Sequence, residues 1–457
     1  MSKLTYNAVM KRQIITSLLK WKDSPLRKPL VLKGARQVGK TYILKIFGKN
    51  FQRYHYFDFE KQRDLNKIFQ VDLNPLRIVK ELSFYLHTPI DIKNDLIIFD
   101  EIQACPQALT SLKYFCEDMP ELALCAAGSL LGIHLNSESY PVGKVDELNL
   151  YPLSFAEFLE AANDDGLQYL QNINLQSQIS EVVHTHLCQQ LKTFFITGGL
   201  PEIVNNYING LKTANSVSDE LIILQNVRAQ QEVLVKAYLA DMAKHAGKTN
   251  AMHVERIWHA VGAQLAQVHD ASSMRFRFKD IVTGINRYSR LVHAIDWLNG
   301  AGLIIKNNVI TTAALPVAAY AKEGFFKLFM FDIGILGAIL NLVPETIMNY
   351  DYGTYKGYFV ENFVAQEFIT SGLVQLYTWQ SKTAEIEFVR EINGEIIPIE
   401  VKSGNITRAK SLKSFIERYH PAYSIVLSNK NFYIDSVRNV HFYPLYLAAQ
   451  IPLATFS

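Results

Sequence analysis

Residues 34–41 have the sequence Gly-Ala-Arg-Gln-Val-Gly-Lys-Thr, between an apolar, β-prone run at 29–32 and a helical pattern at 41–47. Two glycines at this spacing let the backbone curl so that successive N–H groups point inward. The N-terminus of the following helix adds the positive end of its dipole. Such a loop needs a strand before it and a helix after it, so the segment predicts an α/β fold with a phosphate-binding loop.

The chemistry of this loop indicates ATP and Mg²⁺ as its ligands. In the pattern G-x-x-x-x-G-K-[ST] the lysine reaches the β- and γ-phosphates and the hydroxyl ligates Mg²⁺. These roles fall to Lys40 and Thr41. The residues expected to bind the nucleotide are Gly34, Ala35, Arg36, Gln37, Val38, Gly39, Lys40 and Thr41.

Two carboxylates follow the apolar run at 96–99. Asp100 can hold Mg²⁺ through water, and Glu101 can orient and polarise the water that attacks ATP. A buried strand that ends in two solvated acids is the alternative, but the upstream loop favours the nucleotide site. The prediction of hydrolysis rests chiefly on Glu101. Ser129, after another apolar run, is a candidate to contact the γ-phosphate or the lytic water, although a Gly-Ser pair after a strand is also common in turns.

Strand and helix patterns alternate along the first 150 residues. Crossover connections of helix length imply a parallel sheet that is buried on both faces. The five predicted strands are 29–32, 54–59, 96–99, 122–127 and 148–151. An amphipathic helix is expected before them, ending near Pro25.

The rest of the chain is helical to about residue 240, then mixed, then α/β. Helices are expected at 254–267, 278–281 and 289–299, followed by a hairpin that turns at Asn307-Asn308. Three helices and a hairpin are typical of a winged helix. The last hundred residues contain β-prone runs at 384–389, 396–402 and 423–427.

Composition limits the class of protein. The chain has 457 residues, is 49% hydrophobic and 19% charged, and has a net charge of only +3, so it has no overall basic field. Its four cysteines form no C-x-x-C pair, which fits a reducing compartment. The longest apolar stretch, 122–135, is shorter than the ~20 residues needed to cross a bilayer. The start of the chain lacks a cleavable leader pattern. A cytoplasmic protein without a membrane segment is expected.

The chain resembles the AAA-type ATPases of bacteria and archaea that carry a C-terminal DUF4143 domain. The segments that carry the resemblance are 34–41, 99–103, Gly128-Ser129, 151–158, 198–202, 331–334 and 398–402. It implies an AAA-type core at 1–153, a helical lid at 154–245, a winged-helix-like domain at 246–345 and a DUF4143 domain similar to restriction-endonuclease folds at 346–457. By analogy with related ATPases, Pro201 of the lid is expected near the adenine.

The arginine that such ATPases place before the fifth strand is missing. Where the family has Gly-Arg, this chain has Gly143-Lys144. Lys144 is the positional candidate for a cation that acts on a neighbouring subunit's nucleotide. Lysine lacks the planar fork of arginine, so stimulation by assembly is expected to be weaker. A plain surface lysine is the alternative.

A second constellation lies near the C-terminus, at Glu361, Glu387, Glu400 and Lys402. In nucleases with the Asp…Glu-x-Lys pattern two acids hold Mg²⁺ and the lysine steadies the attacking hydroxide. Glu387 stands where aspartate is usual, which disturbs the geometry that Mg²⁺ demands. A structural ion pair of Glu400 and Lys402 in a retired nuclease fold is the favoured interpretation.

Nucleic acid is a further expected partner. Residues 274–279 interleave basic and apolar side chains, and Arg287 and Arg290 flank the next predicted helix. This pattern can grip phosphate and stack bases, but it also describes an amphipathic strand.

Three functions remain open from the sequence. The first is an oligomeric ATPase that remodels or moves a macromolecule, with DNA as the expected one. The second is a slow nucleotide-dependent switch with a protein partner. The third is an ATP-coupled DNA nuclease.

Overall fold

The computed structural model describes residues 10–129, 140–267, 275–278, 281–282, 288–349, 356–402 and 410–454. These residues form two compact units. The N-terminal unit comprises 12–151 together with 300–302, and the C-terminal unit comprises the remainder. The expectations for Met274, Lys279 and Arg287 lie outside the described residues.

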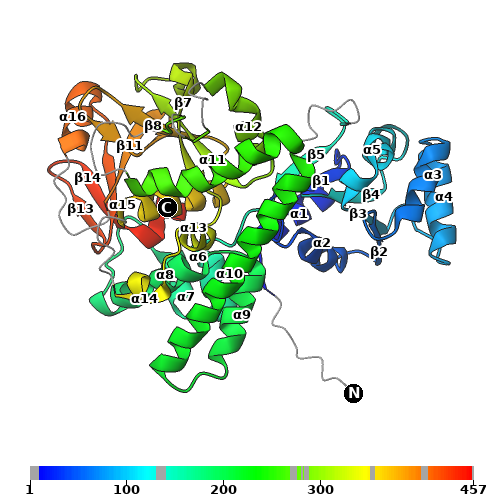
Figure 1. The fold of residues 1–457 in the computed structure, drawn as a ribbon, viewed down its shortest axis with the longest axis horizontal. Helices are drawn as coiled ribbons and strands as arrows, with labels where there is room; N and C mark the ends of the chain where they lie inside the picture. The colour runs from blue at the N-terminus through cyan, green and yellow to red at the C-terminus, as the bar shows by residue number, and fades with distance from the viewer. Residues whose placement is uncertain are drawn as a thin grey trace. The chain divides into compact units, whose positions relative to one another are not determined.

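The N-terminal unit is built on a five-stranded parallel sheet of order β2-β3-β4-β1-β5 (Figure 1). Its strands are β1 (Leu30–Lys33), β2 (Arg53–Asp58), β3 (Asp95–Asp100), β4 (Ala123–Ala127) and β5 (Asp146–Asn149). Its longer helices are α1 (Ile14–Lys22), α2 (Lys40–Gly48), α3 (Asn66–Val71), α4 (Pro75–Tyr85) and α5 (Pro106–Asp118). The predicted α/β core is confirmed.

Burial along the strands explains this order. Every residue of β1, β3 and β4 is buried, as continuous apolar runs inside a parallel sheet require, whereas β5 at the edge alternates between half-buried and exposed residues. An aromatic cluster anchors one face, with Phe99 in edge-to-face contact with Phe57, Phe59 and Phe69 at 5.3–6.0 Å between ring centroids. The sheet is therefore a rigid platform, and its carboxyl edge carries the polar residues that follow β1, β3 and β4.

The first half of the C-terminal unit is helical. Its helices are α6 (Phe155–Ala162), α7 (Gly166–Asn172), α8 (Glu181–Thr197), α9 (Pro201–Leu211), α10 (Val217–His245) and α11 (Lys248–Gln267). Ser154 and Glu157 form a capping box that fixes the start of α6. The helix α10 is the longest of these and packs along α9 (Figure 1).

Two of the motifs that carry the family resemblance meet in a buried polar junction. The Asp332 carboxylate accepts hydrogen bonds from the Gly199 N–H at 2.7 Å and from the Ile335 N–H at 3.0 Å. A Cβ on Gly198 would lie 2.3 Å from Asp332 Oδ1, and one on Gly199 would lie 2.2 Å from the Leu153 carbonyl oxygen. Because neither approach tolerates a side chain, both glycines are required by packing alone.

Two sheets complete the C-terminal unit, with orders β7-β6-β8-β9 and β10-β11-β12-β14-β13. The strands are β6 (Ile304–Ile310), β7 (Ala321–Met330), β8 (Leu376–Gln380), β9 (Glu385–Ile386), β10 (Phe388–Ile392), β11 (Glu395–Val401), β12 (Ser424–Ser428), β13 (Tyr433–Asp435) and β14 (Val440–Pro444). The accompanying helices are α12 (Val292–Gly300), α13 (Ile333–Ile339), α14 (Pro344–Met348), α15 (Lys356–Thr370) and α16 (Lys410–Tyr419).

Two predicted elements of the winged-helix region are wrong. Asn307-Asn308 is not a turn but lies inside β6, because the Asn307 side chain is buried and donates to Thr378 Oγ1 at 2.7 Å. The strand that pairs with β6 as a hairpin is β7, which begins at Ala321. Phe278 is not helical, because its ring packs against Phe326 instead of continuing a helix.

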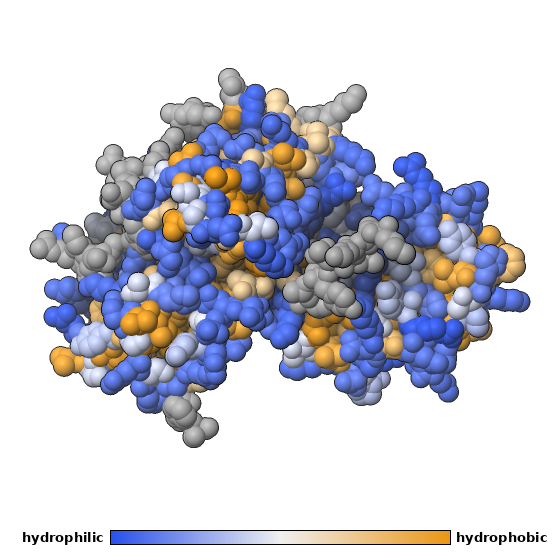
Figure 2. Space-filling model, turned by 90° about the horizontal axis from the view of Figure 1, so that it is seen from below, coloured by the Kyte–Doolittle hydropathy of each residue, from blue (hydrophilic) through white to orange (hydrophobic). Residues whose placement is uncertain are grey.

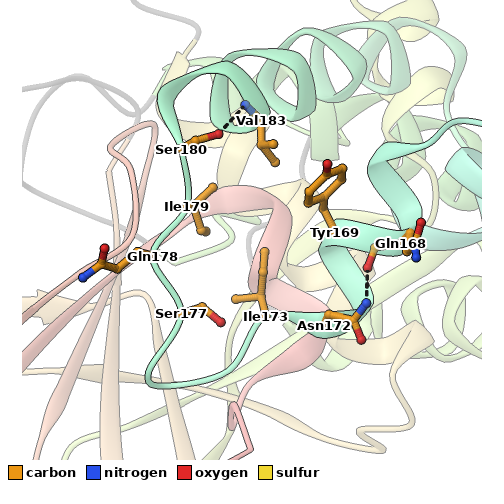
Figure 3. Close-up of a pocket in the computed structure, with 9 residues that line it drawn as sticks. All are labelled: Gln168, Tyr169, Asn172, Ile173, Ser177, Gln178, Ile179, Ser180 and Val183. Carbon is orange, nitrogen blue, oxygen red and sulfur yellow. Dashed lines mark hydrogen bonds between the residues drawn. The ribbon is translucent and has the colours of Figure 1, made fainter.

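Outside the nucleotide motifs, the described residues have a patchy surface and at least one sizeable cavity. On the face shown in Figure 2 hydrophobic residues form several separate patches among hydrophilic ones. No helix in the described ranges is long and apolar enough to cross a membrane. A cavity of about 490 Å³ lies between α7 and the start of α8 (Figure 3), but its lining, from Gln168 to Val183, carries no charged side chain and none of the predicted site residues.

Candidate nucleotide-binding site

The segment between β1 and α2 has the backbone of a phosphate-binding loop. Gly39 has φ 95°, Gln37 has φ 64° and Gly34 has φ 147°, all left-handed or Gly-favoured values that curl the chain. A Cβ on Gly34 would lie 2.2 Å from the Leu150 carbonyl oxygen. The loop ends where α2 begins at Lys40, so the free N–H groups of the first helical turn belong to the same site.

Lys40 is held over the loop itself. Its ammonium donates to the carbonyl oxygens of Gly34 at 2.8 Å and Ala35 at 2.7 Å, and the residue is buried. Burial lowers the pKa of Lys40 to about 8, although the negative charges of Glu101 and Asp100 oppose this shift. A cation whose charge is this poorly solvated gains strongly from an anionic phosphate.

Thr41 and Asp100 meet, as the prediction of a metal site requires. The Thr41 hydroxyl donates to Asp100 Oδ2 at 2.6 Å, and Asp100 is almost fully buried. Tyr56 on β2 donates to the same oxygen at 2.8 Å, a contact that no sequence motif indicates. A buried carboxylate beside a threonine hydroxyl is a hard oxygen set, so these residues fit Mg²⁺.

Glu101 is held in a strained backbone next to this pair. It has φ 49° and ψ 42°, a left-handed conformation that is uncommon for glutamate and is found at functional sites. Gln103 Nε2 donates to Glu101 Oε2 at 2.5 Å, a second contact that the sequence does not signal. Burial raises the pKa of Glu101, and the nearby charge of Asp100 adds to the rise. Its carboxylate is thus a stronger base than a solvated one.

Ser129 follows β4, between the ends of β1 and β3 in the sheet order. Its hydroxyl oxygen is buried and has no hydrogen-bond partner among the described residues. A buried unsatisfied hydroxyl needs an explanation, and a phosphate oxygen or an ordered water would satisfy it.

Arg12 ties the loop to the end of the N-terminal unit. It is buried, donating to the Val38 carbonyl at 3.0 Å and to the Tyr151 carbonyl at 2.7 Å. Sequence reasoning missed Arg12, because a single arginine far from the motif carries no signal. Tyr151 directly precedes Pro152, where the C-terminal unit resumes, so Arg12 links the loop to the connecting chain.

Family models match three segments of this chain. Residues 26–159 match an AAA domain, residues 188–346 match a domain of unknown function (DUF8612), and residues 356–447 match a domain of unknown function (DUF4143). The chain combines an AAA-type P-loop domain with a C-terminal DUF4143 domain. The family resemblance inferred from the motifs is therefore confirmed. No curated protein matches the sequence significantly.

Solved structures resemble the chain only distantly. A Walker-type ATPase of Pyrococcus abyssi is 14% identical, with 72% of this chain and 96% of that chain covered and a TM-score of 0.47. The Orc1 protein of Aeropyrum pernix, solved in complex with DNA, is 11% identical, with 74% and 95% covered and a TM-score of 0.32. AMPPCP-bound DnaA of Aquifex aeolicus is 14% identical, with 63% and 86% covered and a TM-score of 0.28.

Two further predicted nucleotide contacts stay predictions. Lys144 forms an ion pair with Glu117 of its own AAA domain at 2.8 Å, and both side chains are exposed. Exposed pairs of this kind are easily exchanged for another partner. Pro201 begins α9 in the C-terminal unit, and its expected place near the adenine remains a prediction.

The predicted acids of the DUF4143 domain do come together. Glu387 is buried, and the charges of Glu361 and Glu400 add to the rise that burial causes, which brings its pKa to about 8. Lys402 pairs with Glu400 at 2.5 Å. A buried lysine, Lys327 of β7, lies among the same acids.

Glu385 is the acid of this cluster that sequence reasoning missed. Burial raises its pKa to about 7, although its ion pair with Lys327 opposes the rise. Glu385 lies two residues before Glu387 on the predicted strand 384–389, which is interrupted at Glu387. Alternating acids gave a signal here, but without structure only one of them could be matched to the nuclease pattern.

The basic and aromatic segment near Phe276 is largely an internal packing element. Phe276 is buried, and its ring stacks on Phe326 with centroids 6.4 Å apart. Arg275 donates to Gln380 Oε1 at 2.7 Å and lies over the Phe325 ring. The hypothesis that Phe276 stacks on bases is therefore not supported by its position.

Proposed function

We propose that this AAA protein binds ATP with Mg²⁺ at residues 34–41 and hydrolyses it, with Glu101 as the residue that orients and polarises the lytic water. The observation that carries the proposal is the hydrogen bond between Thr41 and Asp100, beside the buried Lys40. It joins the two sequence motifs at one point. When bound, Mg²⁺ would neutralise charge on the β- and γ-phosphates.

Each residue has a separate role in this proposal. Residues 34–39 surround the phosphates with backbone N–H groups. When ATP binds, the Lys40 ammonium exchanges its hydrogen bonds to two loop carbonyls for hydrogen bonds to phosphate oxygens. Thr41 and Asp100 hold the metal, with Tyr56 fixing the Asp100 carboxylate. The buried hydroxyl of Ser129 forms a hydrogen bond to the γ-phosphate or to the lytic water.

The test separates binding from hydrolysis. Lys40→Ala is expected to abolish binding of a fluorescent ATP analogue, whereas Glu101→Gln is expected to keep binding and lose turnover. Gln103→Glu removes the N–H that donates to Glu101 and adds a like charge beside it, so this variant is expected to keep ATP binding and to lower turnover. Wild-type protein that binds no ATP in the presence of Mg²⁺ would refute the proposal.

We further infer that the ATP cycle serves an interaction with nucleic acid, through a homo-oligomer with the four-domain organisation at 1–153, 154–245, 246–345 and 346–457. The turnover rate should then rise with single-stranded, duplex or branched DNA, and the mass measured with ATP should exceed that of one chain. A monomer whose turnover ignores every DNA would remove this part of the proposal.

The slow nucleotide switch is the second candidate. It is favoured by the ion pair of Lys144 with Glu117, because this pair engages the lysine that stands in the position of the family's arginine. Turnover that stays slow at every protein and DNA concentration, together with ATP-dependent capture of a protein partner, would support it.

A further inference from the structure

Lys327 occupies the centre of the acid cluster in the C-terminal unit. Its Nζ lies 3.0 Å from Glu361 Oε2 and 2.5 Å from Glu385 Oε1, and only 8% of its side chain is exposed. The cluster draws on several elements, because Lys327 lies on β7, Glu361 on α15 and Glu385 on β9. No local sequence pattern could bring these residues together.

The backbone of this region holds the acids in fixed positions. Asn307 is the register partner of Lys327 on β6, and its amide donates to the Glu387 carbonyl at 3.3 Å. The Val401 N–H donates to Glu387 Oε2 at 3.0 Å. These two contacts fix both the backbone and the carboxylate of Glu387 within the cluster.

Lys327 is charged in this place. Burial opposes the charged form, but the negative charges of Glu361, Glu385 and Glu387 outweigh it, so that the pKa of Lys327 is raised. A buried ammonium stays charged only when carboxylates pair with it, and buried carboxylates stay charged only when a cation pairs with them. Lysine and acids thus depend on one another.

The same residues do not fit the Mg²⁺ that the restriction-endonuclease resemblance implies. Mg²⁺ requires about six oxygens in near-octahedral geometry. One oxygen of Glu387 accepts the Val401 N–H, and one oxygen of Glu400 pairs with Lys402. Among the residues that the structure describes, no group of three or more His, Cys, Asp and Glu side chains is arranged to hold a metal ion.

We infer that the Lys327 ammonium is the resident cation of this cluster and stands where a nuclease of this fold would hold a divalent metal ion. The acid centre of the C-terminal unit, to which β7 contributes Lys327 from outside the DUF4143 segment, is then neutralised from within and supports no metal-dependent cleavage of DNA. Loss of the lysine removes the cation that contacts Glu361 and Glu385, so it leaves negative charge that an added cation can neutralise. This inference is independent of the ATP site.

The first experiment replaces the internal cation by an external one. Lys327→Met in the full chain is expected to lower the thermal unfolding midpoint, and Mn²⁺ or Ca²⁺ without nucleotide is expected to restore several degrees of it. The matched control is Lys33→Met, which removes another buried lysine that pairs with one acid, Glu147. In that control and in the wild type, the ions should not raise the unfolding midpoint by a comparable amount. Any effect of the ions on the P-loop would appear in all three proteins and can therefore be subtracted. A Lys327→Met protein that folds but gains nothing from the ions would overturn the inference.

The second experiment needs no Lys327 variant, and so decides the question even if Lys327→Met does not fold. Wild-type protein is titrated with Mn²⁺ by electron paramagnetic resonance and incubated with labelled DNA and Mn²⁺. We expect the wild type and Glu387→Gln to bind the same amount of Mn²⁺. We also expect the DNA to remain uncleaved. Cleavage that is lost in Lys402→Ala, or Mn²⁺ binding that depends on Glu387, would show a working metal centre and refute the inference.

Discussion

Single residues at the P-loop show how burial prepares a site for its ligand. Lys40 donates two hydrogen bonds to loop carbonyls, and among the described residues no carboxylate forms an ion pair with its ammonium. Glu101 is buried beside Asp100, so that its pKa is raised. The Glu101 shift has the sign that suits function, because water activation favours a more basic carboxylate. The Lys40 shift disfavours the charged form, so a phosphate that restores the charge must raise this pKa on binding.

The lowered pKa of Lys40 predicts that ATP binding depends on pH. Phosphate binds the charged lysine better, so the pKa rises on binding, and affinity is fully present below the free-state value of about 8. Affinity should fall as the pH rises above that value, by up to about tenfold per pH unit. Fluorescence titrations between neutral pH and pH 9.5 would measure this. Lys40→Arg, which stays charged, should weaken the decline, and an affinity in the wild type that is flat up to pH 9.5 would contradict the prediction.

The candidate site could be predicted from sequence only where its residues lie in one contiguous motif. The loop at 34–41 and the pair Asp100-Glu101 can be recognised in the sequence, because phosphate and metal binding require these residue types at fixed positions after strands. Tyr56, Gln103 and Arg12 make side-chain contacts that no fixed spacing in the sequence indicates, and any sequence contains many such residues.

At the scale of elements, the central strands were predictable and the exceptions were set by tertiary contacts. Continuous apolar runs have one stable solution beside helices, namely a parallel sheet buried on both faces. The Asn307-Asn308 pair was predicted as a turn because asparagine favours turns. A buried hydrogen bond from Asn307 to Thr378 instead stabilises the pair inside β6. Here a tertiary hydrogen bond to a residue 71 positions away outweighs the local turn preference of asparagine.

The glycine pair at the start of α9 gives a prediction for this junction. Gly199→Ala should destabilise the protein by more than about 2 kcal/mol, because the new Cβ would lie 2.2 Å from the Leu153 carbonyl oxygen. Gly357→Ala is the matched control, since its Cβ would meet nothing within 4 Å and a helix favours alanine over glycine. Urea unfolding of both variants measures the difference. Equal midpoints for the two variants would show that the junction can relax.

At the scale of the whole molecule, the two ends of the chain carry contrasting sites. The AAA domain combines a lysine of lowered pKa with a threonine and acids that fit a metal ion. The C-terminal unit combines a lysine of raised pKa, Lys327 of β7, with acids that pair with it. Similar residue types therefore give an open cation site at one end and a self-filled one at the other. Sequence patterns detected both groups of acids, but only the structure distinguishes them, because the deciding residue, Lys327, lies on a different sheet from Glu400.

The final prediction concerns assembly, where Lys144 stands in place of the family's arginine. If Lys144 acts on a neighbouring subunit, it must leave Glu117, so that turnover per chain should rise with protein concentration in the wild type and stay flat in Lys144→Ala. The matched control is Glu117→Gln, which frees the lysine and should raise turnover at low concentration. Lys144→Arg should give the largest stimulation, because its planar fork can bridge two phosphate oxygens. ATP turnover measured across a wide range of protein concentrations, with mass determined in parallel, decides the matter. Assembly with ATP but identical turnover in all four proteins would leave Lys144 as a surface lysine and favour the slow switch over a cooperative motor.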